Sequence, residues 1–450
     1  MSSNNRLHQP SLVACLLGAT LWVAPVAQAQ SVIDPFVERL TEPVMREFVL
    51  ETLERNPRIG ELAASARASG HRARQSGVLP HLAIQFTSFL DSPETRVGPQ
   101  EWTLAASQAL PWGGKRRLQT ESANLEAAAQ AQDADAARLA VLTQLRVLLL
   151  ELDYVGRLIV INETSRSHLA QHEEIARARY ATGSGPGQGV IKLQAAITRI
   201  EHQHLDLESR HLSLRSQING LRDRAPTSPL PSTPATVADL VDLDYDLLLE
   251  LAVERQPAMR AAVLRIDNAG SLNEAAGIAS KPDFRLGLAY TQVGRREDEP
   301  GRLNPPPGNG GDILGIQASV LFPVQRGRVN SAVEEATEGL RRRQEHRRVV
   351  KSGLEQNVAD LVLQLPIRWR QLQLIRDVLV VQAHEALDSA TSGYIAGSLN
   401  SLDLLDAEHV LFDAETAVAR AETDYLVART RLEGAIGLPL EDIPAREVSR

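Results

Sequence analysis

The stretch that decides the fold is the pentapeptide YATGS at Tyr180–Ser184, which returns as YIAGS at Tyr394–Ser398, 214 residues later. The same offset separates Gly220 from Gly434. A repeat this long is a duplicated structural half, since solenoid units have periods of about 20–50 residues. Other landmarks recur in the same order at offsets of 200 to 212 residues: Asn56-Pro57 with Gln256-Pro257, Leu79-Pro80 with Lys281-Pro282, and Pro111 with Pro323.

A very long helix is predicted before each of these turns. Residues 115–181 contain no proline and would span about 100 Å as a helix. Residues 328–395 repeat the pattern, but Pro366 lies inside them, where we expect a kink or a break. After each turn, mostly apolar residues alternate at spacings of three and four, which is typical of a coiled-coil seam packed on the preceding helix. The two stripes are Leu193, Ile197, Ile200, His204, Leu207, His211, Leu214, Ile218 and Leu221, and Ala407, Leu411, Ala414, Val418, Ala421, Tyr425, Ala428, Leu432 and Ala435.

Two strands of about ten residues are predicted in each half. Apolar residues alternate with small or polar ones in residues 82–87, 102–107, 284–291 and 314–322. Such alternation suits a β-barrel that faces lipid outside and water inside. The alternative is that two soluble amphipathic hairpins pack on the helices. Four strands cannot close a transmembrane barrel, since the smallest single-chain barrels have about eight, so on the first reading several chains share one barrel.

The first 29 residues resemble a secretory signal. Arg6 precedes the mostly apolar run 12–26, and Ala27-Gln28-Ala29 suits a cleavage site. Cys15 follows Leu12-Val13-Ala14 as in a bacterial lipid-attachment box, although most of the apolar run comes after it. As the only cysteine, it leaves no disulfide within the chain.

The domain order follows from these landmarks. Four prolines among residues 225–236 break any helix there and predict a linker. The segments expected are a signal peptide at 1–29; a first repeat at 30–224, made of a helix, a β-hairpin at 80–110 and a long helical hairpin at 115–222; a linker at 225–240; a second repeat at 241–437, with its β-hairpin at 282–322 and helical hairpin at 328–437; and a C-terminal tail at 438–450.

Composition excludes some classes of function. The net charge of -8 provides no general attraction to nucleic acid, so we expect no nucleic-acid partner. Aromatic residues make up only 4% of the chain, which favours long helices over an aromatic-packed globular core. Outside the signal no run of 18 apolar residues occurs, so no transmembrane helix is expected and any membrane span is built from strands.

Several motifs resemble the TolC-type outer-membrane efflux family. They include Leu79-Pro80, the run Pro111–Arg116, its counterpart Phe322–Arg328 and the two Tyr-x-x-Gly-Ser turns. The most specific are Asp403-Leu-Leu-Asp406-Ala407 after the second turn and the terminal run Arg431–Pro439. The resemblance covers residues 42–439. The second half is somewhat closer to the heavy-metal cation efflux branch than to the protein-exporting branch.

The resemblance implies a mainly α, internally duplicated fold with a membrane β-barrel. Three chains, with four strands each, would form a 12-stranded barrel in outer-membrane lipid that continues into a long α-helical coiled-coil barrel in the periplasm. It also implies an outer-membrane channel of a tripartite efflux system, whose partners are a periplasmic adaptor (membrane fusion) protein and an inner-membrane efflux pump. The expected cargo is metal cations or small toxic compounds. The alternative is a periplasmic coiled-coil scaffold or adaptor without a membrane-spanning barrel.

The resemblance also assigns site residues. The tip residues expected to contact the adaptor are Gly183, Ser184, Gly397 and Ser398. Asp403 and Asp406 match the acidic constriction of the pore, and their i, i+3 spacing places them on one helix face. Three copies of each would form carboxylate rings that favour cations. Gly189 and Lys192 stand at the equivalent positions of the first repeat, so any ring belongs to the second hairpin; the alternative is that both Asp residues only complement the helix dipole.

No other motif indicates chemistry. The sequence holds no nucleophile elbow, phosphate loop or zinc-hydrolase motif, so we expect no enzyme, no catalytic residue and no cofactor. His168 with His172, and His202 with His204, have spacings that suit a metal on a helix, but no partner carboxylate is identifiable from the sequence. We therefore expect no metal site.

Overall fold

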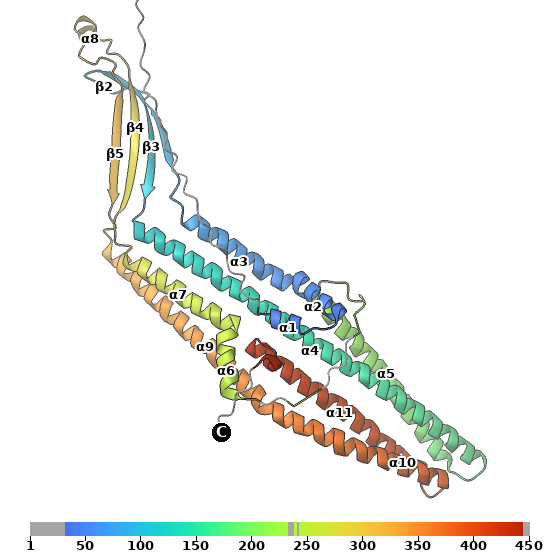
Figure 1. The fold of residues 1–450 in the computed structure, drawn as a ribbon. Helices are drawn as coiled ribbons and strands as arrows, with labels where there is room; N and C mark the ends of the chain where they lie inside the picture. The colour runs from blue at the N-terminus through green and yellow to red at the C-terminus, as the bar shows by residue number, and fades with distance from the viewer. Residues whose placement is uncertain (1–31, 233–237, 241–242, 444–450) are drawn as a thin grey trace, which may run out of the picture. The chain divides into compact units, whose positions relative to one another are not determined.

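The computed structural model describes residues 32–232, 238–240 and 243–443. The expected signal peptide with Cys15 lies outside these residues, as do parts of the expected linker and of the C-terminal tail. The first half comprises α1 (Asp34–Glu38), α2 (Pro43–Arg55), α3 (Pro57–Ser76), β1 (Ala83–Ser88), β2 (Glu94–Thr95), β3 (Gly98–Leu110), α4 (Gly113–Ala181) and α5 (Gly187–Leu221). Figure 1 shows α4 and α5 side by side, as a helical hairpin.

The second half repeats this order. It comprises α6 (Tyr245–Arg255), α7 (Pro257–Gly277), β4 (Asp283–Val293), α8 (Glu299–Leu303), β5 (Ile313–Leu321), α9 (Arg326–Leu374), a π-helical segment (Ile375–Leu379), α10 (Val380–Ala396), α11 (Ser401–Ile436) and a 3₁₀ turn (Leu440–Asp442).

One long-range hydrogen bond occurs in both halves and supports the duplication. The Asn56 side chain, just before α3, donates to the Leu221 carbonyl at the end of α5 over 2.9 Å. Gln256, at the matching position before α7, donates to the Ala435 carbonyl at the end of α11 over 3.0 Å. Each bond satisfies a carbonyl that a helix end leaves without an intrahelical partner. These bonds tie the start of α3 to the end of α5 and the start of α7 to the end of α11.

The strands form an antiparallel sheet in the order β1-β3-β4-β5, with β2 paired to β3 (Figure 1). The register places the apolar residues of all four main strands on one face. Two rows that cross the sheet are Phe86, Leu104, Tyr290 and Leu314, and Ile84, Ala106, Leu288 and Ile316. The opposite face carries small or polar residues, such as the row Gln85, Ala105, Ala289 and Gly315. The predicted alternation is confirmed, whereas the predicted strand length of about ten residues is wrong for β1, which has only six residues.

Aromatic residues mark two levels of the apolar face. Trp102 packs against Phe86 and Tyr290, with ring centroids 5.9 and 5.6 Å away. Nearer the helices, Trp112 stacks on Phe284 with centroids 6.3 Å apart. Phe284 and Tyr290 are six residues apart on β4, roughly 20 Å at about 3.4 Å per residue. Aromatic groups at two levels bound an exposed apolar band, as in sheets that contact lipid.

The helical core follows the predicted stripes. In α5, Leu193, Ile200, Leu214 and Ile218 are buried, whereas His204 and His211 are half-buried. In α11, the buried stripe residues include Ala407, Leu411, Tyr425, Leu432 and Ala435. The hydrophobic effect of burying such stripes, rather than helix propensity, stabilises these long helices.

Of the kink or break expected at Pro366, the break does not occur. α9 continues through Pro366 to Leu374, and the irregularity comes nine residues later, as the π-helical segment Ile375–Leu379. Residues on both sides of Pro366, such as Val362, Leu365 and Leu372, are buried in one hydrophobic cluster, and this packing stabilises the helix despite the missing N–H of the proline. None of the helices within the described ranges is both long and apolar enough to cross a membrane.

Candidate functional site at the helical tip

The turns that end the two long hairpins have the same geometry. Gly183 and Gly397 adopt left-handed conformations, with φ of 72° and 83°. The Ser184 N–H donates to the Arg179 carbonyl and the Ser398 N–H to the Gly393 carbonyl, both over 2.9 Å. Each serine hydroxyl donates to the same carbonyl as its own N–H, over 3.1 Å. No atom lies within 4 Å of a Cβ added at either glycine, so the left-handed backbone rather than a steric clash disfavours a side chain there.

The four predicted tip residues therefore occupy two equivalent, exposed turns. Each glycine reverses the chain, and each serine satisfies a carbonyl at the end of the preceding helix. The turns leave their outer surface open to a partner.

Arg179 joins the two turns. Its guanidinium donates to the carbonyls of Tyr394 and Ile395 and lies 4.4 Å from the centroid of the Tyr394 ring. Tyr394 is buried, and this burial raises the pKa of its phenol. Its repeat counterpart Tyr180 is mostly exposed. The two turns are similar in sequence but differ in their surroundings. Of the two tyrosines, Tyr394 is covered by an arginine of the other hairpin, whereas Tyr180 is not.

Asp403 and Asp406 lie in the first two turns of α11, and both are exposed. Asn400 caps the helix, since its side chain accepts from the N–H groups of Leu402 and Asp403. The Asp403 carboxylate accepts from the Asn400 N–H over 3.1 Å, which completes a capping box. Asp403 therefore has a structural role at the helix start, whereas Asp406 projects from the same face without being part of the cap.

The first repeat departs from the acidic pattern for a steric reason. Gly189, the counterpart of Asp403, packs against Ser401, and a Cβ on Gly189 would lie 2.3 Å from the Ser401 hydroxyl. A side chain at Gly189 would therefore require the Ser401 side chain, at the start of α11, to move. The contact brings the two helix starts together and leaves the acidic pair to the second hairpin.

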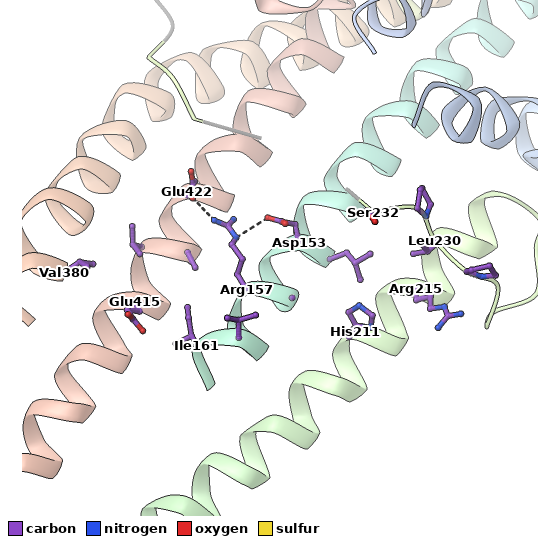
Figure 2. Close-up of a pocket in the computed structure, with 17 residues that line it drawn as sticks. Asp153, Arg157, Ile161, His211, Arg215, Leu230, Ser232, Val380, Glu415 and Glu422 are labelled. Atoms are coloured by element: carbon purple, nitrogen blue, oxygen red, sulfur yellow. Dashed lines mark hydrogen bonds and ion pairs between the residues drawn. The ribbon is translucent and has the colours of Figure 1, made fainter. Parts of the chain in front are cut away.

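Between the tip and the strands, polar links join α4 to α11. Arg157 on α4 contacts Glu422 over 2.6 Å and Asp153 over 3.1 Å, as Figure 2 shows. A cavity of about 870 Å³ lies beside this link and is lined mainly by apolar residues of α4 and α11 and by the segment 229–232. A second link, Arg146 to Glu433, measures 2.6 Å. The sequence offers many Arg and Glu residues in these helices, so reasoning from it did not single out these pairs.

The histidine pairs differ in their surroundings. His202 and His204 face carboxylates of their own helix, with 3.9 Å to Asp206 and 3.5 Å to Glu208. His168 and His172 instead face Glu408 on α11. In the part of the chain that the structure describes, no three His, Cys, Asp or Glu side chains are already arranged as ligands of one metal ion.

Comparisons with known proteins agree with this geometry. The family profile described as outer membrane efflux protein matches residues 248–438. The chain is 23% identical over 363 residues to the cobalt-zinc-cadmium resistance protein CzcC of Cupriavidus metallidurans, an alignment that covers 76% of this chain and 79% of CzcC.

Solved structures show the same fold. The outer membrane protein VceC of Vibrio cholerae has a TM-score of 0.72 at 20% identity, covering 88% of this chain and 96% of VceC. The CmeC outer membrane channel of Campylobacter jejuni has a TM-score of 0.75 at 14% identity, covering 97% of this chain and 94% of CmeC. The similarity thus extends over most of this chain and most of each of these two proteins.

Proposed function

Since this chain belongs to the TolC-type family of outer membrane efflux proteins, we propose that three copies of it form the exit duct of a tripartite efflux system. As a member of this family, the protein is an outer-membrane efflux channel that extends into the periplasm. A periplasmic adaptor and an inner-membrane pump supply the other two parts. The chain itself carries out no reaction and needs no cofactor, because passage through a duct forms and breaks no covalent bond.

The observation that carries the proposal is the sheet. It presents an apolar face bounded by aromatic residues, and its edge strands β1 and β5 each have one neighbour in the described residues. An open edge in lipid leaves backbone groups without hydrogen bonds, at a cost of several kcal/mol each. Pairing β5 of one copy with β1 of the next closes a barrel of twelve strands from three chains. A periplasmic scaffold has no use for such a face, so the alternative is not favoured.

The tip is proposed as both the docking point and the gate. The turns at Gly183, Ser184, Gly397 and Ser398 are equivalent in geometry, so three chains offer six similar turns to an adaptor. Asp403 and Asp406 are exposed on one face of α11 within two turns of the tip. Three copies arranged around an axis bring these carboxylates into rings, which attract cations and repel anions.

Divalent metal cations are the cargo that this arrangement favours. The relative CzcC is named for cobalt, zinc and cadmium resistance, and carboxylate rings lower the electrostatic barrier for cations. With three Met and one Cys in the chain, soft sulfur ligands do not line a route through it. The duct would pass hydrated cations, while selection among metals belongs to the pump and the adaptor.

Growth of a deletion strain tests this function. We expect the strain to become sensitive to cobalt, zinc and cadmium salts and a plasmid copy of the wild-type chain to restore growth, while the empty vector does not. Hydrophobic antimicrobials should inhibit the deletion and complemented strains equally. Complemented sensitivity to the antimicrobials alone would instead indicate a multidrug partner and overturn the metal cargo.

A further inference from the structure

A buried histidine and glutamate pair links the two hairpins near the tip. Glu408 on α11 is 2% exposed and His172 on α4 is 8% exposed. The His172 Nε2 atom lies 2.9 Å from the Glu408 Oε1 atom. His168, one helical turn earlier on the same face of α4, places its Nδ1 atom 3.4 Å from the same oxygen. Two imidazoles therefore converge on one carboxylate oxygen.

More ligand-type side chains lie around this pair. Glu415 follows Glu408 by two helical turns on α11, and burial raises the pKa of its carboxyl, against the opposing attraction of His384 and His168. The His384 Nε2 atom, on α10, lies 3.7 Å from a Glu415 oxygen. Elsewhere along the same seam, as in Arg157–Glu422 and Arg146–Glu433, an arginine supplies the positive charge. Here imidazoles face the carboxylates in place of a permanent cation.

We propose that His168, His172 and Glu408 bind a divalent cation of the zinc type inside the wall of the helical hairpins. Two imidazole nitrogens and one carboxylate oxygen are a donor set that Zn²⁺ and Co²⁺ accept. In a tetrahedral site with bonds of about 2.0–2.1 Å, neighbouring ligand atoms lie about 3.3 Å apart. The measured separations from the Glu408 oxygen, 3.4 and 2.9 Å, bracket this value.

The site requires a small adjustment before it can hold the ion. The described residues contain no preformed set of three ligands, so one ring must turn toward the others. His168 is the ring that is free to do so, because its side chain is 39% exposed, whereas His172 and Glu408 are held by packing. The same exposure provides an entry path for the ion. Water would complete the coordination.

A metal ion bound at this site would affect the tip of the hairpins. Glu408 follows Asp406 by two residues on α11, and both histidines belong to the other hairpin. An ion bound there would fasten the start of α11 to α4. The concentration of metal in the periplasm would then affect how firmly the second hairpin is held, whichever cargo the duct conducts.

Metal binding to the purified, tag-free protein tests the proposal. Titration calorimetry with Zn²⁺ should show one site per chain, and Co²⁺ should give the visible absorption of a tetrahedral complex. His168→Gln and Glu408→Gln should each weaken binding by at least about tenfold, the lower end of the range seen when only an outer-shell partner is removed. His202→Gln is the matched control, since His202 is 75% exposed and faces Asp206 on its own helix.

His168→Gln is the decisive variant because its side chain is half-exposed and its loss leaves the His172–Glu408 bond in place. If the Glu408→Gln variant fails to assemble, the His168→Gln variant still tests whether the metal site exists. Absence of Zn²⁺ binding by the wild type, or equal binding by wild type and His168→Gln, overturns the site. The assay uses no transport readout, so its result is independent of the susceptibility test of the duct.

Discussion

Ile316→Arg is expected to prevent the protein from assembling in the outer membrane, whereas Gln317→Arg on the same strand is expected to leave assembly intact. Ile316 is 83% exposed and pairs with Leu288 on the apolar face of the sheet. Gln317 pairs with Gly287 on the opposite face. An arginine that faces lipid near the bilayer midplane costs about 2–4 kcal/mol, and a trimer would carry three of them. An arginine that faces the lumen remains in water.

The measurement is the amount of heat-modifiable trimer in the outer-membrane fraction for the wild type and both variants. The two variants place the same residue at adjacent positions of one strand, so the main difference between them is the face of the sheet. Equal assembly of both variants would contradict a lipid-facing surface. Loss of assembly in both variants would also contradict the proposed barrel, because an arginine on the lumen face should be tolerated.

The double variant Asp403→Asn with Asp406→Asn is expected to lower the preference of the channel for cations and to raise its resting conductance severalfold. Six carboxylates at the proposed constriction attract cations but also retain them, and conduction requires that a bound ion can leave again. Removing the charge should therefore reduce the preference for cations and let ions pass the tip more freely. Asparagine preserves side-chain size, and its amide oxygen still accepts the Asn400 N–H at the start of α11. The variant thus changes charge with little effect on the cap.

Conductance and reversal potential in planar bilayers under a salt gradient measure both effects. Asp413→Asn is the matched control, because Asp413 is exposed on the same helix but lies further from the tip. An unchanged reversal potential in the double variant would reject the gate and leave Asp403 with its capping role alone. A shift of equal size in Asp413→Asn would show a general effect of surface charge rather than a constriction.

Much of the fold was predictable because it depends on local, periodic patterns. The alternation of period two in β3, β4 and β5 and the apolar stripes of α5 and α11 repeat over many residues. Each pattern therefore identifies which face of its strand or helix is apolar. The two turns were predictable because a left-handed residue such as Gly397 strongly favours glycine. The break that Pro366 led us to allow does not occur, because residues on both sides of the proline are buried in the helical core.

The site was less predictable because its contacts join residues distant in sequence. Glu408 is 236 residues from His172, and Arg179 is 215 residues from Tyr394, so neither partner could be chosen among many similar residues. The histidine spacing was visible, but without Glu408 it did not indicate a site. Gly189 looked like a departure from a motif until the structure placed Ser401 against it. The adaptor contacts and the gate stay predictions because they depend on three chains and on a partner.

Fractionation of cells followed by mass measurement of the detergent-extracted protein tests the central claim most directly. The account predicts that the chain is recovered in the outer-membrane fraction, dissociates only on heating, and has the mass of three chains after the detergent contribution is subtracted. Recovery of a monomer in the soluble periplasmic fraction would contradict it, because an exposed apolar sheet with two open edges could not then be a membrane barrel.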